Sequence, residues 1–201
     1  MAKKSIFSFL NFLKDEDEDS ISLEKSMLRH KIRAQKKELT DEQKIEASNK
    51  IFEKIEQMPD FKQAKTLMMY WSTSREVPTH DFIEKWSSEK KILLPVVVGR
   101  MMVLKPFTGR ENLTRSELGI WEPQAQETYL EEIDLAIIPG SAFDRKKRRL
   151  GRGRGYYDHY LKQKKIKKWG IAYDFQLVDT VPAAEHDIKM NKIITPSYTV
   201  E

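Results

Sequence analysis

The sequence predicts a single-domain, three-layer α/β/α fold with a mainly parallel sheet and helices on both faces of that sheet. Largely apolar segments at residues 66–71, 91–98 and 133–138 are typical of strands that are buried on both faces. Helical patterns alternate with these segments, which indicates parallel strands joined by crossover helices. The chain has 201 residues, 39% of them hydrophobic, and no internal repeat, so one core is expected. Together these features predict a Rossmann-like arrangement.

The N-terminal residues 1–20 combine a basic start, a short apolar run and five consecutive acids at 15–19. Ser8 and Asn11 interrupt the apolar run, no small-residue cleavage site follows it, and it is too short to span a bilayer. An amphipathic anchor or a partner-docking helix is the alternative interpretation. We expect a poorly ordered tail at 1–20, followed by one domain at 21–201.

Two helices are expected next. Residues 25–38 place Leu28 and Ile32 one turn apart, while Lys25 and Arg29 form an i, i+4 basic pair whose usual place is a solvated helix face. Thr40, followed three residues later by a glutamine, is typical of a capping box and predicts the start of a second helix. Pro59 is expected to end that helix.

The first strand, 66–71, leads into a polar loop at 72–76, and a helix follows at 81–86. Ligands of open α/β sheets bind at the carboxyl ends of strands, so Trp71 and Glu76 are candidates for substrate contact. A core position for Trp71 and a solvated position for Glu76 are the alternatives. The strand at 91–98 contains Pro95 and is expected to pair with 101–104, whereas residues 106–130 show little periodicity. A helix at 156–163 and strands at 169–173 and 193–194 complete the prediction.

The most informative segment follows the strand at 133–138. Glycines alternate with arginines there, and a helix start with two tyrosines comes directly afterwards; the residues are Gly151, Arg152, Gly153, Arg154, Gly155, Tyr156 and Tyr157. Glycine permits close approach of a ligand, the arginine fork suits phosphate oxygens, and a helix N-terminus favours an anion. The spacing matches neither a P-loop nor the dinucleotide fingerprint G-x-G-x-x-G.

The charge distribution supports an anionic ligand. Residues 145–168 hold twelve Lys or Arg and one acid, Asp158, so this segment alone exceeds the +5 net charge of the chain. A basic glycine loop is also found in nucleic-acid-binding arms, where tyrosines stack on bases. Asp158 and Asp187, the latter in the loop 185–187, favour a metal–nucleotide site, because carboxylates hold Mg²⁺ but repel a nucleic-acid backbone. Asp158 is equally compatible with a plain dipole-favoured acid in the first helical turn.

The chain contains no cysteine, which excludes disulfides, thiolate metal sites and a thiol nucleophile. This composition suits a reducing compartment, so we expect a cytoplasmic protein.

Three motifs, in order and spacing, resemble the 5-formyltetrahydrofolate cyclo-ligase (5,10-methenyltetrahydrofolate synthetase) family: IPGSAFD, RLGRGRGYYDHYL and EHDIKMNKIIT. KSMLR and YWSTSREVPT extend the resemblance over residues 25–195. The resemblance implies ATP- and Mg²⁺-dependent cyclisation of 5-formyltetrahydrofolate to 5,10-methenyltetrahydrofolate with release of ADP and phosphate. The formyl oxygen attacks the γ-phosphate, N10 then attacks the activated carbon, and phosphate leaves.

The resemblance also implies roles for individual residues. Arg152 and Arg154 would neutralise the transferring phosphoryl group, Trp71 and Glu76 would contact folate, and Asp158 and Asp187 would hold Mg²⁺. The ATP-binding set would be Lys25, Arg29, Arg149, Leu150, Gly151, Arg152, Gly153, Arg154, Gly155, Tyr156 and Tyr157. Because Lys25 and Arg29 belong to this set, their helix is expected to fold back over the loop. The expected partners are ATP and 5-formyltetrahydrofolate, including polyglutamylated forms attracted by the basic residues at 145–148 and 162–168. Nucleic acid and a membrane span are not expected, and the protein is expected to be a monomer. A basic nucleic-acid-binding module is the alternative function.

Overall fold

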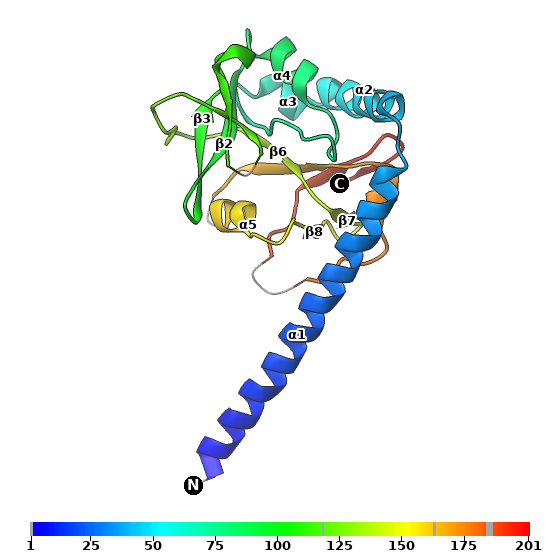
Figure 1. Ribbon diagram of the computed structural model, residues 1–201, viewed down its shortest axis with the longest axis vertical. Helices are drawn as coiled ribbons and strands as arrows, with labels where there is room; N and C mark the ends of the chain where they lie inside the picture. Colours follow the sequence, from blue (N-terminus) through cyan, green and yellow to red (C-terminus); the bar gives the residue numbers. More distant parts are fainter. Residues whose placement is uncertain (1, 118, 163, 184–186) are drawn as a thin grey trace.

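The computed structural model describes residues 2–117, 119–162, 164–183 and 187–201, with the side chains of the first helix described from Asp19 onward. Gln163 and His186, which the sequence analysis placed in a helix and a loop, lie outside these residues. Within the described part of the chain, a seven-stranded sheet forms the middle layer (Figure 1). In spatial order its strands are β12 (Thr199–Val200), β11 (Lys192–Ile194), β9 (Lys167–Ile171), β6 (Leu135–Pro139), β1 (Thr66–Met68), β2 (Lys91–Val98) and β3 (Met101–Pro106).

The pairing of these strands confirms the predicted mainly parallel sheet. The inner strands β11, β9, β6, β1 and β2 run parallel, and the edge strands β12 and β3 are antiparallel to their neighbours. Pro95 lies inside β2 without disrupting the sheet, because β1 pairs with β2 only as far as Leu93 and Pro95 opposes Leu104 of the antiparallel strand β3. A proline lacks an N–H donor and is tolerated where no neighbouring strand needs that donor, and on the β1 side β2 is no longer paired at Pro95.

One face of the sheet is covered by three helices: α2 (Asp41–Gln57), α3 (Pro59–Gln63) and α4 (His80–Trp86). Their buried side chains, such as Ile55 and Phe61, pack on alternate residues of the parallel strands, including Leu67 and Ile137. The capping box predicted at Thr40 is confirmed, with the Gln43 N–H donating to the Thr40 hydroxyl and the Thr40 N–H donating to Gln43 Oε1. These three helices therefore form one outer layer.

The other face has a mixed cover, and only part of it was expected. The helix α5 (Tyr156–Leu161) packs there beside a second sheet of β10 (Leu177–Val178), β7 (Ala142–Asp144) and β8 (Arg149–Leu150). This small sheet was not predicted, since two- and three-residue strands are too short to show periodicity. The long helix α1 (Ala2–Lys37) packs on it through Ile32, which contacts Ala142 and Leu150 (Figure 1).

The N-terminal helix is longer than the sequence indicated. The expected helix at 25–38 continues in the structure to Ala2, as one helix of 36 residues. The division into a tail at 1–20 and a domain at 21–201 stays a prediction. Within the described residues, no helix combines the length and the apolar content that crossing a membrane requires.

Several boundaries differ from the prediction. β1 ends at Met68 instead of residue 71, because the backbone from Tyr70 to Ser72 bonds with Thr79 and leaves the sheet: the Thr79 hydroxyl donates to the Tyr70 carbonyl and accepts from the Ser72 N–H. Pro59 ends the second helix as predicted, since α2 stops at Gln57, and it also begins the short helix α3, where a proline needs no N–H partner.

Residues 106–130 contain elements that the sequence did not reveal. They are η1 (Arg110–Asn112) and the hairpin of β4 (Leu113–Arg115) and β5 (Trp121–Pro123), which packs against β2. A further short helical turn, η2 (Asp174–Gln176), follows β9.

Candidate active site

The segment of alternating glycines and arginines forms a loop between β8 and α5, beside the carboxyl ends of β6 and β1. Gly153 and Gly155 have backbone φ angles of +105° and +69°, a region that residues with a Cβ adopt rarely. The Ser141 N–H donates to the Leu150 carbonyl at 2.6 Å, which fixes the start of the loop against the end of β6. The glycines therefore let the chain turn sharply from the small sheet into α5.

Two cavities lie on opposite sides of this loop. One, of about 280 Å³, is called the aromatic cavity here because tyrosines and tryptophans line it. The other, of about 460 Å³, is called the basic cavity because Lys25, Arg29 and Lys162 line it. Both are bordered by Arg149, Gly151, Gly155 and Asp158, so these four residues form a shared wall.

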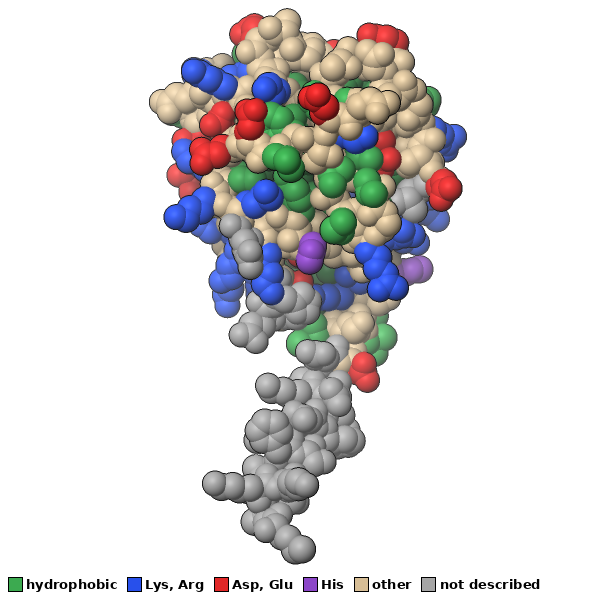
Figure 2. All heavy atoms as spheres, turned by 90° about the vertical axis from the view of Figure 1, so that its left-hand side faces the viewer, with side chains coloured by type: hydrophobic (Ala, Val, Ile, Leu, Met, Phe, Trp, Pro, Cys, Tyr) green, Lys and Arg blue, Asp and Glu red, His purple; other side chains and the backbone are tan. Residues whose placement is uncertain are grey.

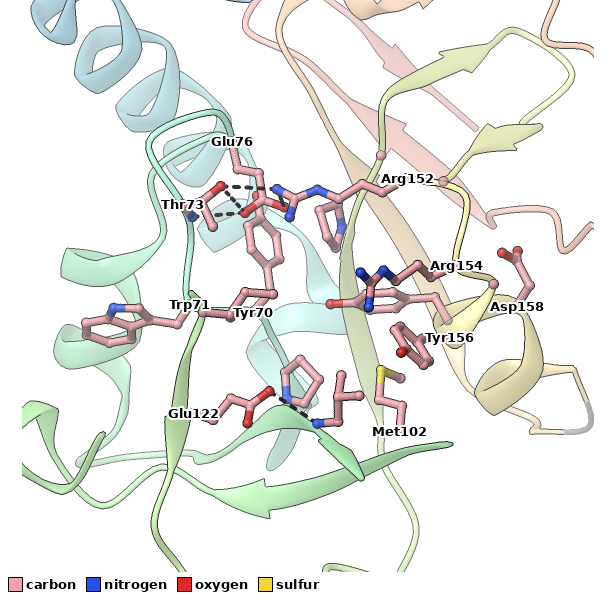
Figure 3. A pocket seen from close by; sticks show the side chains of 18 of the residues that line it. Tyr70, Trp71, Thr73, Glu76, Met102, Glu122, Arg152, Arg154, Tyr156 and Asp158 are labelled. Atoms are coloured by element: carbon pink, nitrogen blue, oxygen red, sulfur yellow. Dashed lines mark hydrogen bonds and ion pairs between the residues drawn. The ribbon is translucent and has the colours of Figure 1, made fainter. Parts of the chain in front are cut away.

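The aromatic cavity receives residues from distant parts of the chain (Figure 3). The loop after β1, the strands β2 and β3, the β4–β5 hairpin and the glycine–arginine loop all contribute. Its apolar and aromatic lining consists of Tyr70, Trp71, Pro95, Val97, Met102, Ile120, Trp121, Pro139, Tyr156 and Tyr157. The carboxylates on its lining are Glu76, Glu122 and Asp158. Such a surface suits a flat, largely apolar ligand with a few polar groups.

Helix α1 closes the basic cavity, as expected from the position of Lys25 and Arg29. Arg29 Nε donates to the Gly151 carbonyl at 2.9 Å, and Lys25 Nζ lies 2.5 Å from Asp187 Oδ2. Burial lowers the pKa of Arg29, while the Asp187 carboxylate acts in the opposite direction. The helix therefore brings two cations over the loop from more than a hundred residues away.

Arg152 and Glu76, which were assigned to different substrates, contact each other. Arg152 Nη2 lies 2.6 Å from Glu76 Oε1 and 3.1 Å from the Thr73 hydroxyl. The other Glu76 oxygen accepts from the Thr73 N–H and hydroxyl at 2.9 and 3.0 Å. Arg152 is half exposed, whereas Glu76 is buried, so the arginine is the partner that can move.

Arg154 and the two tyrosines lie on the loop side of the aromatic cavity. Figure 3 shows Arg154 beside Tyr156, directed toward the interior of the cavity. Burial raises the pKa of Tyr157, and the nearby Glu76 carboxylate adds to that rise. Tyr157 therefore stays a neutral phenol at physiological pH.

Arg149 is placed differently from the exposed arginines of the loop. It is buried, with Nη2 donating to Asp158 Oδ2 at 2.7 Å and Nη1 donating to the Pro139 carbonyl at 3.1 Å. Its Nε has no hydrogen-bond partner among the residues that the structure describes. Arg149 thus ties α5 to the end of β6 and forms part of the shared wall.

Asp158 and Asp187, the predicted magnesium ligands, both line the basic cavity. Asp158 is paired with Arg149, and the backbone N–H of Ile188, the residue after Asp187, lies 3.5 Å from Asp158 Oδ1. In the described part of the chain, no group of three His, Cys, Asp or Glu side chains is placed to hold a metal. Two carboxylates fit a Mg²⁺ ion that takes its other ligands from phosphate and water.

Trp71 lines the aromatic cavity, but its indole is occupied by protein partners. The ring stacks on His80 at 4.1 Å and on Phe107 at 5.4 Å between centroids, and it is 6% exposed. In Figure 3 the indole points away from Met102 and Tyr156. A substrate contact through Trp71 stays a prediction.

Several residues that line the aromatic cavity were not predicted from the sequence. Tyr70, Met102, Trp121 and Glu122 come from strand ends or from the β4–β5 hairpin, where no motif marked them. Lys36 lines neither cavity but is coupled to the site electrostatically: burial lowers its pKa to about 8, Glu76 opposes this effect and Arg152 reinforces it. A Trp-Glu pair in an otherwise aperiodic segment was the one signal available for the hairpin.

Known proteins resemble this chain over most of its length. The model of the 5-formyltetrahydrofolate cyclo-ligase family matches residues 21–196. The 5-formyltetrahydrofolate cyclo-ligase of Escherichia coli (strain K12) is 32% identical over 181 residues, which cover 85% of this chain and 99% of that protein.

Two solved structures share the fold. The NMR structure of Aquifex aeolicus 5,10-methenyltetrahydrofolate synthetase superposes with a TM-score of 0.79 at 32% identity, covering 87% of this chain and 91% of that one. The 5,10-methenyltetrahydrofolate synthetase of Mycoplasma pneumoniae superposes with a TM-score of 0.70 at 26% identity, covering 86% and 98%.

Proposed function

This chain belongs to the 5-formyltetrahydrofolate cyclo-ligase family and is a ligase with that activity, and we propose that its two cavities hold the two substrates of the reaction. The aromatic cavity would take 5-formyltetrahydrofolate and the basic cavity the triphosphate of ATP. The observation that carries this assignment is the shared wall of Arg149, Gly151, Gly155 and Asp158. A reaction that joins two substrates requires their reacting atoms to meet, and this wall is where the cavities adjoin.

The chemistry of each lining agrees with this division. The pyrimidine half of the pteridine and the benzoyl ring of 5-formyltetrahydrofolate are flat and bury well among tyrosines and methionine. A triphosphate carries several negative charges and suits Lys25, Arg29 and Lys162, which line the basic cavity. The proposed ATP contacts also include Leu150, Gly153 and Tyr156, whose backbone belongs to the loop.

The proposed reaction has two steps. The formyl oxygen attacks the γ-phosphorus, so that an O–P bond forms and the bond to the β-phosphate oxygen breaks, releasing ADP. N10 then attacks the activated formyl carbon and loses its proton, and the C–O bond to phosphate breaks. The first step converts a poor leaving group into a good one, and positioning plus charge stabilisation supply most of the rate.

Arg152 and Arg154 are the residues placed to stabilise charge on the transferring phosphoryl group. Both side chains border the aromatic cavity from the glycine–arginine loop, and Arg152 is exposed enough to exchange its Glu76 partner for phosphate. Release of Arg152 would free one Glu76 oxygen to accept a hydrogen bond from folate. The predicted roles of Arg152 and Glu76 are thereby linked.

Asp158 and Asp187 would hold a Mg²⁺ ion in the basic cavity, where that ion would offset phosphate charge. Their present partners, Arg149 and Lys25, keep both carboxylates close to the loop. Asp187 would then exchange its contact with Lys25 for the ion, leaving that lysine near phosphate.

Three further expectations accompany this function. We propose a cytoplasmic enzyme that works as a monomer. We also propose that polyglutamylated folates are substrates, drawn by the basic residues at 145–148 and 162–168, which flank the glycine–arginine loop. Figure 2 shows Lys and Arg side chains on both flanks of one face of the molecule, with hydrophobic side chains between them.

The test is turnover of purified protein with 5-formyltetrahydrofolate, ATP and Mg²⁺, followed by the absorbance of the methenyl product and by phosphate release. We expect one phosphate per ring closed and no reaction when either ATP or Mg²⁺ is left out. Product formation without ATP, or ATP hydrolysis without product, would contradict the proposed use of the two cavities.

A further inference from the structure

A buried carboxyl group lies in the aromatic cavity at a position that no motif marked. Glu122 belongs to β5, is 9% exposed and lines the cavity together with Val97 and Met102. One of its oxygens, Oε1, accepts a hydrogen bond from the Val97 N–H at 3.2 Å (Figure 3). This bond fixes the carboxyl group relative to the strand β2.

The remaining hydrogen-bonding capacity of Glu122 is unused by the protein. Among the described residues, no ion pair and no second hydrogen bond involves this side chain. Burial raises the pKa of Glu122, although the Val97 N–H and the charge of Lys105 partly offset this effect. A carboxylate with free lone pairs in apolar surroundings is unfavourable until a donor reaches it.

The other two carboxylates of the cavity differ in this respect. Glu76 is held by Arg152 and Thr73, and Asp158 is held by Arg149. Of the three, within the described residues, Glu122 is the one that forms no ion pair, although the charge of Lys105 acts on it from a distance. It also lies farther from the loop, with Arg154 on the other side of the cavity in Figure 3.

The substrate offers donors that match this carboxylate. The pyrimidine half of the pteridine carries a ring N3–H and an exocyclic 2-amino group, which are adjacent and coplanar. The reacting formyl group is attached to N5 on the other ring. A pteridine with N5 near the loop arginines therefore has its pyrimidine edge directed away from the loop.

We propose that Glu122 is a specificity-determining residue that accepts hydrogen bonds from the aminopyrimidine edge of folate and so orients N5 toward the glycine–arginine loop. This inference rests on the assignment of folate to the aromatic cavity. A carboxylate paired with two N–H donors forms short, charge-assisted hydrogen bonds, and a site built around such a pair rejects a ligand that lacks one donor.

The test measures equilibrium binding without ATP, by titrating the protein with 5-formyltetrahydrofolate and with its analogue that lacks the 2-amino group. The variants are Glu122→Gln and the matched control Glu127→Gln, an exposed residue of the same segment. The wild type and Glu127→Gln should bind the parent compound about 10- to 100-fold more tightly than the analogue. Glu122→Gln should bind both with nearly equal affinity, since its amide keeps an acceptor for Val97 but loses the charge.

Other outcomes separate the explanations. An unchanged preference in Glu122→Gln would overturn the proposal, and so would loss of the preference in Glu76→Gln alone. If Glu122 only holds the β4–β5 hairpin, its substitution lowers the melting temperature and weakens both ligands equally. Glu122→Asp, which retracts the carboxylate by one methylene, provides a second variant with the charge retained and should show an intermediate preference. Failure of the wild type to bind either compound would instead contradict the assignment of folate to this cavity.

Discussion

At the scale of single residues, the site contains charges that are already paired with one another. Arg152 pairs with Glu76, Arg149 with Asp158, and Lys25 with Asp187. All three pairs join residues that the resemblance assigned to different ligands: ATP and folate in the first, and ATP and Mg²⁺ in the other two. Substrate binding would therefore exchange partners in addition to adding contacts, and substitutions should show which exchange matters.

The first prediction concerns Arg152. Replacing it with alanine should lower kcat by about 10²- to 10³-fold, the range typical for loss of one charge-stabilising donor. The melting temperature should change little, because Arg152 is half exposed and the Thr73 N–H and hydroxyl still donate to the Glu76 carboxylate. Arg100→Ala, in the exposed turn between β2 and β3, is the control and should keep full activity. Wild-type kcat in Arg152→Ala would remove this residue from the mechanism.

The second prediction concerns the two aspartates. Asp158→Asn and Asp187→Asn should each raise the Mg²⁺ concentration needed for half-maximal turnover, by on the order of tenfold, since each loses a charged oxygen ligand. Asp158→Asn should also lower the melting temperature, because it leaves the buried Arg149 without its anion. A Mg²⁺ titration at saturating ATP measures the effect, and unchanged Mg²⁺ dependence in both variants would contradict the assignment.

The third prediction is a pH dependence of stability at Lys36. Its pKa falls from 10.5 in the unfolded chain to about 8 in the fold. Between these values the unfolded chain binds more protons, so this group makes stability rise with pH over that interval. Lys36→Met should therefore be more stable than the wild type below about pH 8, by a margin that shrinks as pH approaches 10.5. Urea unfolding across this range measures the margin, and a constant margin would argue against a lowered pKa.

At the scale of elements, α1 completes the basic cavity from outside the sheet. Arg29 of this helix contacts the glycine–arginine loop, Lys25 pairs with Asp187, and Ile32 packs on the small sheet. These are side-chain contacts along one face of the helix. Helix α1 therefore covers the proposed phosphate site, so removing one of its contacts should weaken ATP binding more than folate binding.

The fourth prediction tests this role of α1. Lys25→Ala should raise the KM for ATP, by about 10-fold for loss of one charge-assisted contact, and leave the KM for folate within about twofold. Lys31→Ala, an exposed lysine of the same helix, is the matched control. Steady-state kinetics with each substrate varied in turn provide the measurement. An equal rise in both KM values would indicate that α1 supports the fold as a whole and not the ATP site.

The predictability of the elements follows from how local their causes are. The capping box at Thr40 and the strand Lys91–Val98 were predicted correctly, because the residues that define them are adjacent in sequence. The end of β1 was placed three residues too late, since the bonds to Thr79 that divert the chain involve a residue far along the loop. The β4–β5 hairpin was missed because three-residue strands carry no period.

The site was predictable to the same extent. The glycine–arginine loop stood out through composition alone, and its place beside the ends of β1 and β6 followed from the parallel topology. The contact of Arg152 with Glu76 and the seclusion of Trp71 between His80 and Phe107 depend on side-chain packing across the fold. Such pairings have no signature in one sequence.

At the scale of the whole molecule, the lysines that follow α5 are divided between the carboxyl ends and the amino ends of the parallel strands. Lys162 lines the basic cavity, whereas Lys164, Lys165 and Lys167 surround a groove near Asp134 at the start of β6. The first group lies with the substrates and the second at the opposite end of the strands. This division supplies an internal control for the proposed attraction of polyglutamate tails.

The fifth prediction uses that control. Replacing Lys162, which lines the basic cavity, with glutamine should reduce the ratio of kcat/KM for polyglutamylated over monoglutamylated substrate by several-fold, while replacing Lys164 and Lys165 should leave the ratio unchanged. The wild-type ratio should also fall as salt is raised, since exposed charges are screened. Equal losses for both substrates in the first variant would remove the attraction hypothesis.

The glycines in the wall between the two cavities have a pharmacological consequence. At Gly155 nothing lies within 4 Å of the position that a Cβ would take, whereas at Gly151 the Arg149 guanidinium lies 3.1 Å from that position. A single molecule that carries a pteridine at one end and a nucleotide at the other could pass this wall with a bridge of only a few atoms. Such a bisubstrate inhibitor would gain the affinity of both halves, and a bulky residue at either glycine would confer resistance to it.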